Sequence, residues 1–128
     1  MTDLATLARD CFATYQTQDR EALERLLADD FTFTSPYDDH IDRATYFVRC
    51  WPNAGTYDKF ELQHVIAHGD ACWVTYEGHR RNGSWFRNTE LLRFAGDKIC
   101  SVEVFFGLPP HTPPTRPPVD GRSESSRS

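Results

Sequence analysis

The sequence WVTYEGHRRNGSWFRNTELL, residues 73–92, holds two runs of alternating apolar and polar side chains on either side of Asn82-Gly83. An Asn-Gly pair in this setting favours a β-hairpin with a two-residue turn. That turn places four opposed pairs on one side of the sheet: His79 with Phe86, Glu77 with Asn88, Thr75 with Glu90, and Trp73 with Leu92. The sequence therefore predicts a pocket wall in which aromatic side chains surround four proton-active or hydrogen-bonding groups, Glu77, His79, Asn88 and Glu90.

Upstream of this hairpin, the spacing of apolar residues changes from two to three and four, which is typical of amphipathic helices. Asp19 is the expected N-cap of the second helix. Phe and Thr alternate just before Ser35-Pro36, which indicates a short strand that ends at the proline. The predicted elements are helices over residues 3–17, 19–28 and about 42–51, a strand over 31–34 and a loop over 37–40.

Residues 59–107 are predicted to form a four-strand antiparallel meander with turns at residues 69–70, 82–83 and 96–97. Helices followed by strands indicate an α+β domain whose helices pack on one face of a curved sheet. We expect one domain over residues 1–107. Residues 108–128 are rich in Pro and then in Ser, Arg and Glu, a composition that predicts a disordered tail.

The composition excludes several classes of protein. The net charge of -5 over 128 residues argues against a nucleic-acid partner, because phosphate binding relies on clustered Lys and Arg. No apolar run is long enough for a membrane span or a signal peptide, so the expected location is the cytoplasm. The four cysteines form no Cys-x-x-Cys pair and are expected to be reduced, buried thiols. We therefore expect no metal and no cofactor.

Several motifs resemble those of a known superfamily. They are Ala28-Asp29-Asp30, Phe31-Thr32-Phe33-Thr34-Ser35-Pro36 and Ser101-Val102-Glu103-Val104-Phe105-Phe106-Gly107. Over residues 3–107 the chain resembles the nuclear transport factor two-like superfamily and, more narrowly, SnoaL-like and ketosteroid isomerase-like proteins. The resemblance implies a cone of bent, mixed or antiparallel sheet, closed by three N-terminal helices around a deep pocket. Members of the superfamily include isomerases, dehydratases, epoxide hydrolases, polyketide cyclases and non-catalytic binders.

The resemblance to ketosteroid isomerase can be followed residue by residue. That enzyme uses a carboxylate base and an oxyanion hole made of a tyrosine and a protonated acid. Aligned on Ala28-Asp29-Asp30, the position of the base falls on Ser35, which cannot serve as that base. The tyrosine position falls on Cys11, although Tyr15 lies one turn later on the same helical face. The acid position falls on Glu90, so one of the three roles is retained.

Both the pairing in the hairpin and the resemblance to ketosteroid isomerase indicate Glu90 as a site residue. A carboxyl group buried among aromatic side chains has a raised pKa and can donate a proton near neutral pH. The alternative is an ionised core acid held by Tyr or His partners. His79 is the candidate base at the pocket rim, and its alternative is a solvated hairpin residue next to Arg80-Arg81. Glu77 and Asn88 could instead hydrogen-bond to each other across the strands.

Asp38, Asp39 and His40 form a second candidate cluster, in a loop that the resemblance places at the mouth of the cone. Two acids beside a histidine can activate water or, if other ligands converge, bind a divalent metal. The commoner role of such residues is to cap the following helix. Trp51 and Tyr46 are expected either to line the pocket or to pack the third helix.

The register of the last strand has two solutions. A two-residue turn at Gly96-Asp97 places Glu103 opposite Glu90, and two neighbouring carboxyls then share a proton. A three-residue loop instead makes Val102, Val104 and Phe106 line the pocket, and we prefer it because the inner face stays apolar. The opposite face is then too apolar for bare solvent, and the resemblance implies a homodimer through it: Val74, Tyr76, Trp85, Thr89 and Leu91 with Arg80 and Arg87.

Three functions remain open. The first is an enzyme that moves a proton on an apolar, carbonyl-bearing metabolite by isomerisation, cyclisation, dehydration or hydrolysis. The second is a binder of a small molecule without catalysis, and the third is a dimeric interaction domain. The candidate catalytic residues are Glu90, His79, Asp38, Asp39 and His40; the candidate substrate-binding residues are Tyr15, Trp51, Trp73, Phe86, Asn88, Val104 and Phe106.

Overall fold

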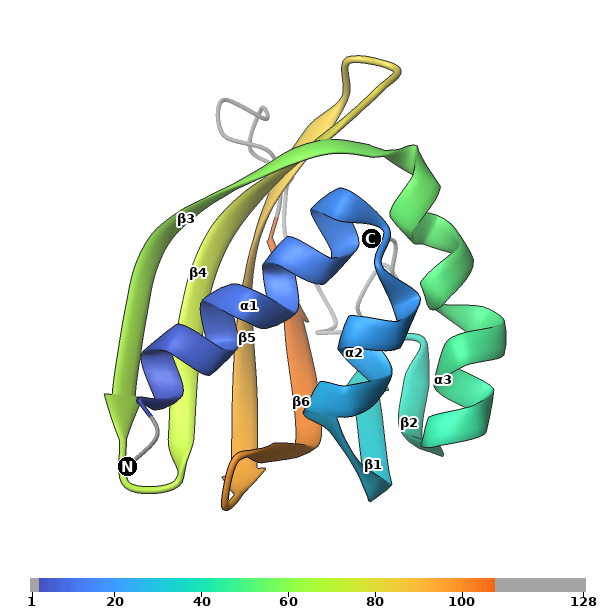
Figure 1. Ribbon diagram of the computed structural model, residues 1–128. Coiled ribbons are helices and arrows are strands. Elements are labelled where there is room, and N and C mark those ends of the chain that lie inside the picture. Colours follow the sequence, from blue (N-terminus) through green and yellow to red (C-terminus); the bar gives the residue numbers. More distant parts are fainter. Residues whose placement is uncertain (1–2, 108–128) are drawn as a thin grey trace, which may run out of the picture.

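The computed structural model describes residues 3–107, along which ten elements follow one another (Figure 1). In chain order they are α1 (Leu4–Thr17), α2 (Arg20–Leu26), β1 (Leu27–Ser35), β2 (Asp38–Asp42), α3 (Arg43–Arg49), the 3-10 helix η1 (Trp51–Thr56), β3 (Tyr57–His68), β4 (Ala71–Arg80), β5 (Trp85–Ala95) and β6 (Lys98–Phe106). The predicted helices are all present. Strand β2 was not predicted, since it occupies most of the segment expected to be a loop, and residues 108–128 of the predicted tail lie outside the described residues.

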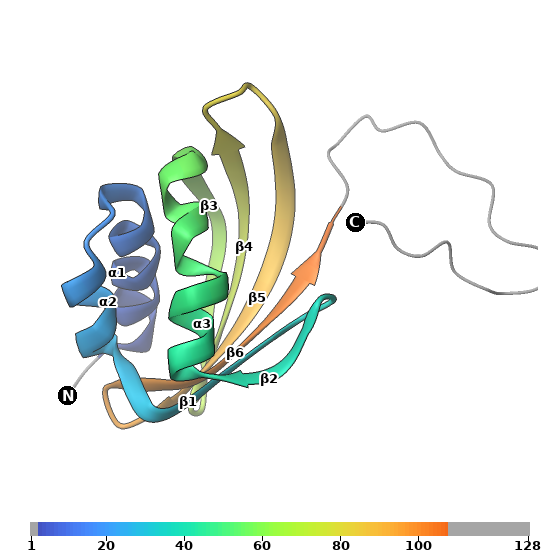
Figure 2. The ribbon, with the colours of Figure 1, turned by 90° about the vertical axis from the view of Figure 1, so that its right-hand side faces the viewer.

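The six strands form one curved sheet in the order β2-β1-β6-β5-β4-β3. Strands β1 and β6 run parallel, whereas the other neighbouring strands are antiparallel. Figure 2 shows the three α-helices on the concave side of this sheet, with the β4–β5 hairpin extending beyond them. The predicted α+β fold, a curved mixed sheet with three N-terminal helices, is confirmed. Within residues 3–107 no helix has the length and apolar character needed to cross a membrane.

An aspartate caps the start of each α-helix. The carboxylates of Asp3, Asp19 and Asp42 accept hydrogen bonds from backbone N–H groups in the first turns of α1, α2 and α3. These caps satisfy N–H groups that have no partner within the helix. The sequence predicted the cap at Asp19, and the cap of α3 is Asp42 rather than a residue of the 38–40 cluster.

The apolar faces of the helices pack with the concave face of the sheet into one hydrophobic core. The side chains most completely buried in it are Phe31, Leu23, Leu92, Ile99, Val74 and Cys72. They come from α2 and from strands β1, β4, β5 and β6, so burial of their apolar area fixes the helical layer on the sheet.

The register of the β4–β5 hairpin differs by one residue from the predicted register. Three residues, 81–83, form the loop: the Arg80 amide donates to the Ser84 carbonyl oxygen at 2.9 Å, and Gly83 has φ +92°. A three-residue loop that ends in a residue with positive φ is the second common way to build a hairpin on Asn-Gly. His79 therefore pairs with Trp85, and Glu77 pairs with Arg87.

For β6, the prediction that Val102 and Val104 face the pocket is right, although the three-residue loop predicted between β5 and β6 is wrong. The turn at Gly96-Asp97 has two residues, because Ala95 pairs with Lys98. One extra residue of β6 then shifts the register, so that Phe94 pairs with Ile99 and Arg93 pairs with Ser101. This bulge returns Val102 and Val104 to the concave side, where both are buried.

The one-residue shift exchanges the two faces of β4. Val74 and Tyr76, predicted for the convex face, are buried on the concave side, and Arg80 follows them there. Trp73 lies on the convex face, where it is 41% exposed and stacks against Phe105. The reason is geometric: side chains alternate along a strand, so a slip of one residue moves every side chain to the other face.

Candidate functional site

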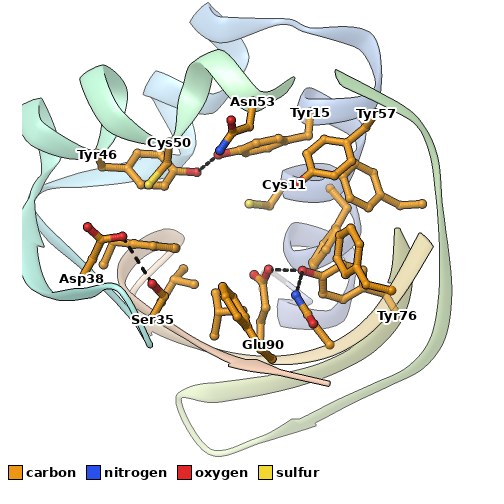
Figure 3. A pocket seen from close by; sticks show the side chains of 18 of the residues that line it. Cys11, Tyr15, Ser35, Asp38, Tyr46, Cys50, Asn53, Tyr57, Tyr76 and Glu90 are labelled. Carbon is orange, nitrogen blue, oxygen red and sulfur yellow. Dashed lines mark hydrogen bonds between the residues drawn. The ribbon is translucent and has the colours of Figure 1, made fainter. Parts of the chain in front are cut away.

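A cavity of about 870 Å³ lies between the helices and the concave face of the sheet. Its walls come from α1, α3, η1 and all six strands, together with residues that connect β1 to β2 and β4 to β5. Aromatic rings dominate the lining: Phe12, Tyr15, Phe31, Phe33, Tyr37, Tyr46, Tyr57, Phe60, Tyr76, Trp85, Phe86 and Phe106. Figure 3 shows this hollow with Tyr15 and Tyr46 on one side and Glu90 and Tyr76 on the opposite side.

Glu90 projects from β5 into this apolar space. Burial raises the pKa of Glu90 from 4.5 to about 7, and the hydrogen bond from Tyr76 limits that rise. The cause is desolvation, because a carboxylate loses its water shell among aromatic rings. Near neutral pH the carboxyl group therefore exists in both protonation states, which suits it to donate or accept a proton.

A chain of hydrogen bonds holds Glu90 in place. The Gly107 amide donates to Asn88 Oδ1 at 3.0 Å, and Asn88 Nδ2 donates to the Tyr76 hydroxyl at 3.4 Å. The Tyr76 hydroxyl then donates to Glu90 Oε2 at 2.7 Å. A Cβ atom on Gly107 would lie 2.1 Å from the Arg87 carbonyl oxygen, so only glycine lets the chain pass there. The end of β6 thus fixes the orientation of the acid on β5.

Across the cavity, the hydroxyl groups of Tyr15 on α1 and Tyr46 on α3 form a short hydrogen bond (Figure 3). Burial raises the pKa of both tyrosines well above 10.0, and the charge of Glu90 adds to the rise. Both therefore stay protonated at neutral pH. Since one hydroxyl donates to the other, the second O–H remains able to donate to a bound molecule.

Asp38 is the second acid in the cavity, at the β1–β2 end. Its side chain is only 9% exposed and forms an ion pair with Arg49, whose Nη2 lies 2.5 Å from Asp38 Oδ1. Ser35 Oγ donates to Asp38 Oδ2 at 3.3 Å. Ser35 is the residue aligned with the base of ketosteroid isomerase, so the Asp38 carboxylate lies next to the position that the base would occupy.

Two thiols also face the cavity, Cys11 on α1 and Cys50 after α3. Burial raises the pKa of the Cys11 thiol, and it raises the pKa of Cys50 to about 11. Both thiols are therefore protonated at neutral pH, the form that is a poor nucleophile and a poor metal ligand. All four cysteines are free; Cys11 and Cys72 are buried as predicted, whereas Cys50 and Cys100 are only partly buried.

Seven of the residues predicted for the site line the cavity: Tyr15, Asp38, Phe86, Asn88, Glu90, Val104 and Phe106. The other five do not. Asp39 and His40 are exposed, and their side chains form a hydrogen bond with each other. Trp51 packs behind the wall, with its ring 5.0 Å from the ring of Tyr15. His79 and Trp73 lie on the convex face, because the hairpin loop has three residues instead of two.

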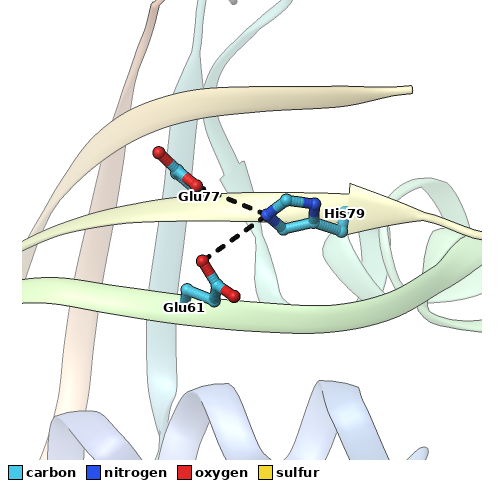
Figure 4. Close-up of side chains that lie close together, drawn as sticks. All are labelled: Glu61, Glu77 and His79. Atoms are coloured by element: carbon cyan, nitrogen blue, oxygen red, sulfur yellow. Dashed lines mark hydrogen bonds and ion pairs between the residues drawn. The ribbon is translucent and has the colours of Figure 1, made fainter. Parts of the chain in front are cut away.

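The predicted place of His79 and Glu77 in the pocket is therefore wrong. Figure 4 shows both side chains on β4 close to Glu61 on β3, and the register places all three on the face opposite to Tyr76. His79 Nε2 lies 3.4 Å from Glu77 Oε1 and 3.7 Å from Glu61 Oε1, and Glu77 also pairs with Arg87 at 2.7 Å. Three possible metal ligands meet here, but the neighbouring cations Arg87 and Lys59 already neutralise the two acids.

Sequence reasoning missed the partners of Glu90. Tyr76 was assigned to the convex face, and Arg80 with it, because of the one-residue error in the hairpin. Tyr46 was left between lining and packing, and it does both: its ring contacts Phe31 while its hydroxyl reaches Tyr15. The signal that could have placed Tyr76 is the run Val74, Tyr76, Gly78, whose apolar members alternate with polar ones.

Comparisons with known proteins agree with this architecture. Residues 8–102 match the family model of the SnoaL-like domain. No curated protein matches the chain.

Three solved structures show the same fold. An NTF2-like protein of unknown function from Cytophaga hutchinsonii is 18% identical, with a TM-score of 0.69 over 83% of this chain and 91% of that chain. An NTF2-like protein from Burkholderia thailandensis is 24% identical, with a TM-score of 0.64 over 82% and 91%. A protein from Catenulispora acidiphila with a ketosteroid isomerase-like fold, in complex with trimethylamine, is 18% identical, with a TM-score of 0.63 over 80% and 85%. The resemblance to SnoaL-like proteins found in the sequence is confirmed: the chain belongs to the SnoaL-like family and has the fold of the NTF2-like structures.

Proposed function

We propose that the protein binds a small, largely apolar molecule with a carbonyl group in this cavity and transfers a proton on it. The observation that carries the proposal is the Glu90 carboxyl group, whose pKa burial raises to about 7 within an aromatic cavity. A group that changes protonation state near neutral pH is suited to general acid or base catalysis. Isomerisation, cyclisation, dehydration and hydrolysis all use such a step.

The lining residues divide into two sets with complementary roles. Protonated Glu90 donates a proton to the carbonyl oxygen, and the free O–H of the Tyr15–Tyr46 pair is a second donor from the opposite wall. The Asp38 carboxylate accepts the proton that leaves the carbon next to the carbonyl group. The product of this step is the enol, and returning a proton to a different carbon completes an isomerisation.

The test needs no knowledge of the natural substrate. 2-Tetralone, an apolar bicyclic ketone, exchanges the protons next to its carbonyl group for deuterium in D2O, and NMR follows the exchange. We expect the protein to accelerate this exchange, and Glu90→Gln to lower the rate about a hundredfold while the affinity for 2-tetralone is retained. Asp38→Asn is expected to lower the rate as well.

Glu77→Gln is the matched control, since it makes the same chemical change on the convex face of the same hairpin. It should leave the exchange rate unchanged. If 2-tetralone binds and the wild-type protein does not accelerate exchange, the catalytic role is wrong and the cavity serves as a binding site only. If Glu77→Gln and Glu90→Gln lower the rate equally, the carboxyl group in the cavity is not the acid.

We also propose that two copies associate through the convex face. Three large apolar side chains are exposed there: Ile66 by 59%, Phe105 by 46% and Trp73 by 41%. Trp73 and Phe105 stack with ring centroids 6.4 Å apart, which makes a flat apolar patch. Light scattering should give the mass of a dimer, and Trp73→Glu should give the mass of a monomer. A monomeric wild-type protein would contradict the proposal.

A further inference from the structure

Arg80, the last residue of β4, brings a positive charge into the cavity. Its guanidinium carbon lies 4.6 Å from the ring centroid of Phe86 and 5.7 Å from that of Tyr57. Such positions over an aromatic face attract a cation. We call Arg80, Phe86 and Tyr57 the arginine platform.

The strand beneath the platform fixes its position. Gly78 faces the cavity between Tyr76 and Arg80, and a Cβ atom there would lie 2.4 Å from Cζ of Phe86. The absence of a side chain at Gly78 therefore allows the Phe86 ring to lie against the strand. Phe86 in turn contacts Tyr57, with ring centroids 5.9 Å apart. Arg80 rests on a surface that is already packed, so less side-chain freedom is lost when it binds a ligand.

Within the part of the chain that the structure describes, the charge of Arg80 has no acidic partner. Among residues 3–107, no carboxylate oxygen lies within 4.0 Å of a side-chain nitrogen of Arg80. The other arginine at the cavity, Arg49, is neutralised by Asp38. With Glu90 protonated, the cavity therefore carries one uncompensated positive charge, although the whole chain has a net charge of -5.

The platform and the acid stand at different depths of the same cavity. Phe86 and Glu90 are four residues apart on β5 and both face inward, which separates their Cα atoms by roughly 13 Å at about 3.3 Å per residue. Ser84, whose carbonyl oxygen pairs with the Arg80 amide, also lines the cavity, so the platform lies at the hairpin end. A ligand that reaches both groups has its two polar ends on opposite sides of an apolar body.

We propose that the ligand of this cavity is an organic anion, an apolar molecule with a carboxylate or similar acidic group that pairs with Arg80. Its body lies among the aromatic rings, and its carbonyl group faces Glu90. The assignment of the carbonyl end rests on the proposed function, whereas the assignment of the anionic end rests on Arg80 alone. Arg80 is then a specificity-determining residue, because a planar guanidinium pairs with an acidic group through two hydrogen bonds.

Two fluorescent dyes test the anionic end. 8-Anilinonaphthalene-1-sulfonate and N-phenyl-1-naphthylamine share one apolar skeleton and differ in the sulfonate group. Titration of the full chain gives a dissociation constant for each dye. We expect the wild-type protein to bind the sulfonate dye more tightly, and Arg80→Gln to weaken the sulfonate dye about tenfold while the neutral dye changes by less than about twofold.

Arg87→Gln is the matched control, because it removes the same charge from the same hairpin on the convex face. It should leave both dissociation constants unchanged. Arg80→Lys keeps the charge without the planar fork and should lose part of the preference. Thermal unfolding of each variant, together with retained binding of the neutral dye, shows that the cavity is intact.

Three results would overturn the proposal: a wild-type protein with no preference for the sulfonate dye, an equal loss for both dyes in Arg80→Gln, or an equal loss in Arg80→Gln and Arg87→Gln. The last result would mean that overall charge sets the preference. None of these measurements depends on turnover. The proposed pairing of the anionic group with Arg80 can therefore be wrong while Glu90 still accelerates deuterium exchange in 2-tetralone, and the reverse also holds.

Discussion

Two glutamates on neighbouring strands of one hairpin, Glu77 on β4 and Glu90 on β5, have opposite environments. Glu90 faces the concave side, where burial raises its pKa to about 7. Glu77 faces the convex side, where Arg87, Gln63 and His79 surround its carboxylate and hold its pKa below 4.5, mainly through the hydrogen bond from Arg87. The face of the sheet thus decides whether the same side chain is a proton donor or a fixed charge.

The two faces also stabilise their polar groups differently. On the convex side, charged partners within 4.0 Å compensate each other beside water. On the concave side, a neutral chain of hydrogen bonds leads from Gly107 through Asn88 and Tyr76 to Glu90. Burial in a low-dielectric site favours the protonated acid. The comparison therefore predicts opposite responses to pH from the two glutamates.

The largest expected effect is the pH-dependent stabilisation by Glu90→Gln. Between pH 4.5 and about 7, Glu90 keeps its proton in the folded protein and releases it in the unfolded chain. The unfolded state binds fewer protons there, so the free energy of unfolding of the wild-type protein falls as pH rises. A glutamine does not ionise, so above pH 7 the variant gains on the order of 3 kcal/mol relative to the wild type.

Chemical denaturation of both proteins below pH 4.5 and above pH 7 measures this difference. At the acidic end the two stabilities should be close, because Glu90 is then protonated in both states. A difference that does not change with pH would mean that Glu90 has an ordinary pKa, and the distinction between the two faces would disappear.

Gly78→Ala is expected to have a smaller effect, a loss of folding stability. The new Cβ atom would lie 2.4 Å from Cζ of Phe86, so the ring must move away from the strand. Overpacking of this kind costs about 1–3 kcal/mol. Since Arg80 rests on that ring, the affinity for the sulfonate dye should fall as well.

Gly96→Ala provides a reference for the conformational freedom of glycine, since a Cβ atom there would meet nothing within 4 Å although φ is +65°. It should change stability through the backbone and leave both dye affinities unchanged. Equal dye binding by Gly78→Ala and the wild type would show that the position of Phe86 does not determine that of Arg80.

Tyr76→Phe should raise the pKa of Glu90 further, because the hydrogen bond from the Tyr76 hydroxyl stabilises the carboxylate. The carboxyl carbon chemical shift of Glu90, followed by NMR across pH, gives this value directly. Thr75→Val is a suitable control, since it removes a hydroxyl that hydrogen-bonds to Thr89 on the other face. A pKa that falls in Tyr76→Phe would contradict the direction of the hydrogen bond.

Local patterns predicted the helices and the concave face of β5. Apolar spacing and the Asp19 cap depend only on residues within one or two turns, which is why the helices agree with the structure. Phe86, Asn88 and Glu90 were placed inward and are inward. Strand β2 was missed because its pairing with β1 is a tertiary contact that leaves little trace in a segment of four polar residues and Ile41.

The turn sequence alone could not settle the orientation of β4, because that orientation depends on a loop length that Asn82-Gly83 leaves open. Both a two-residue turn and a three-residue loop use a glycine with positive φ. The Asn82 carboxamide accepts hydrogen bonds from Ser84, which stabilises the longer loop. With one more residue in the loop than predicted, Tyr76 instead of Glu77 faces the cavity. Tyr76 is also the residue that donates a hydrogen bond to Glu90.

Glu77→Gln should change the stability least, and in the direction opposite to Glu90→Gln. The pKa of Glu77 is lower in the folded protein than in the unfolded chain, so its ionised form stabilises the fold above pH 4.5. That stabilisation is lost as pH falls through the lowered pKa. Glu77→Gln should therefore be slightly less stable than the wild type at neutral pH and equal to it in acid, the reverse of Glu90→Gln.

High salt should reduce the difference in stability between Glu77→Gln and the wild type, because it screens the ion pair of Glu77 with Arg87. If Glu77→Gln instead gained stability as pH rises, Glu77 would face the cavity, and the two-residue turn expected from Asn82-Gly83 would be right after all.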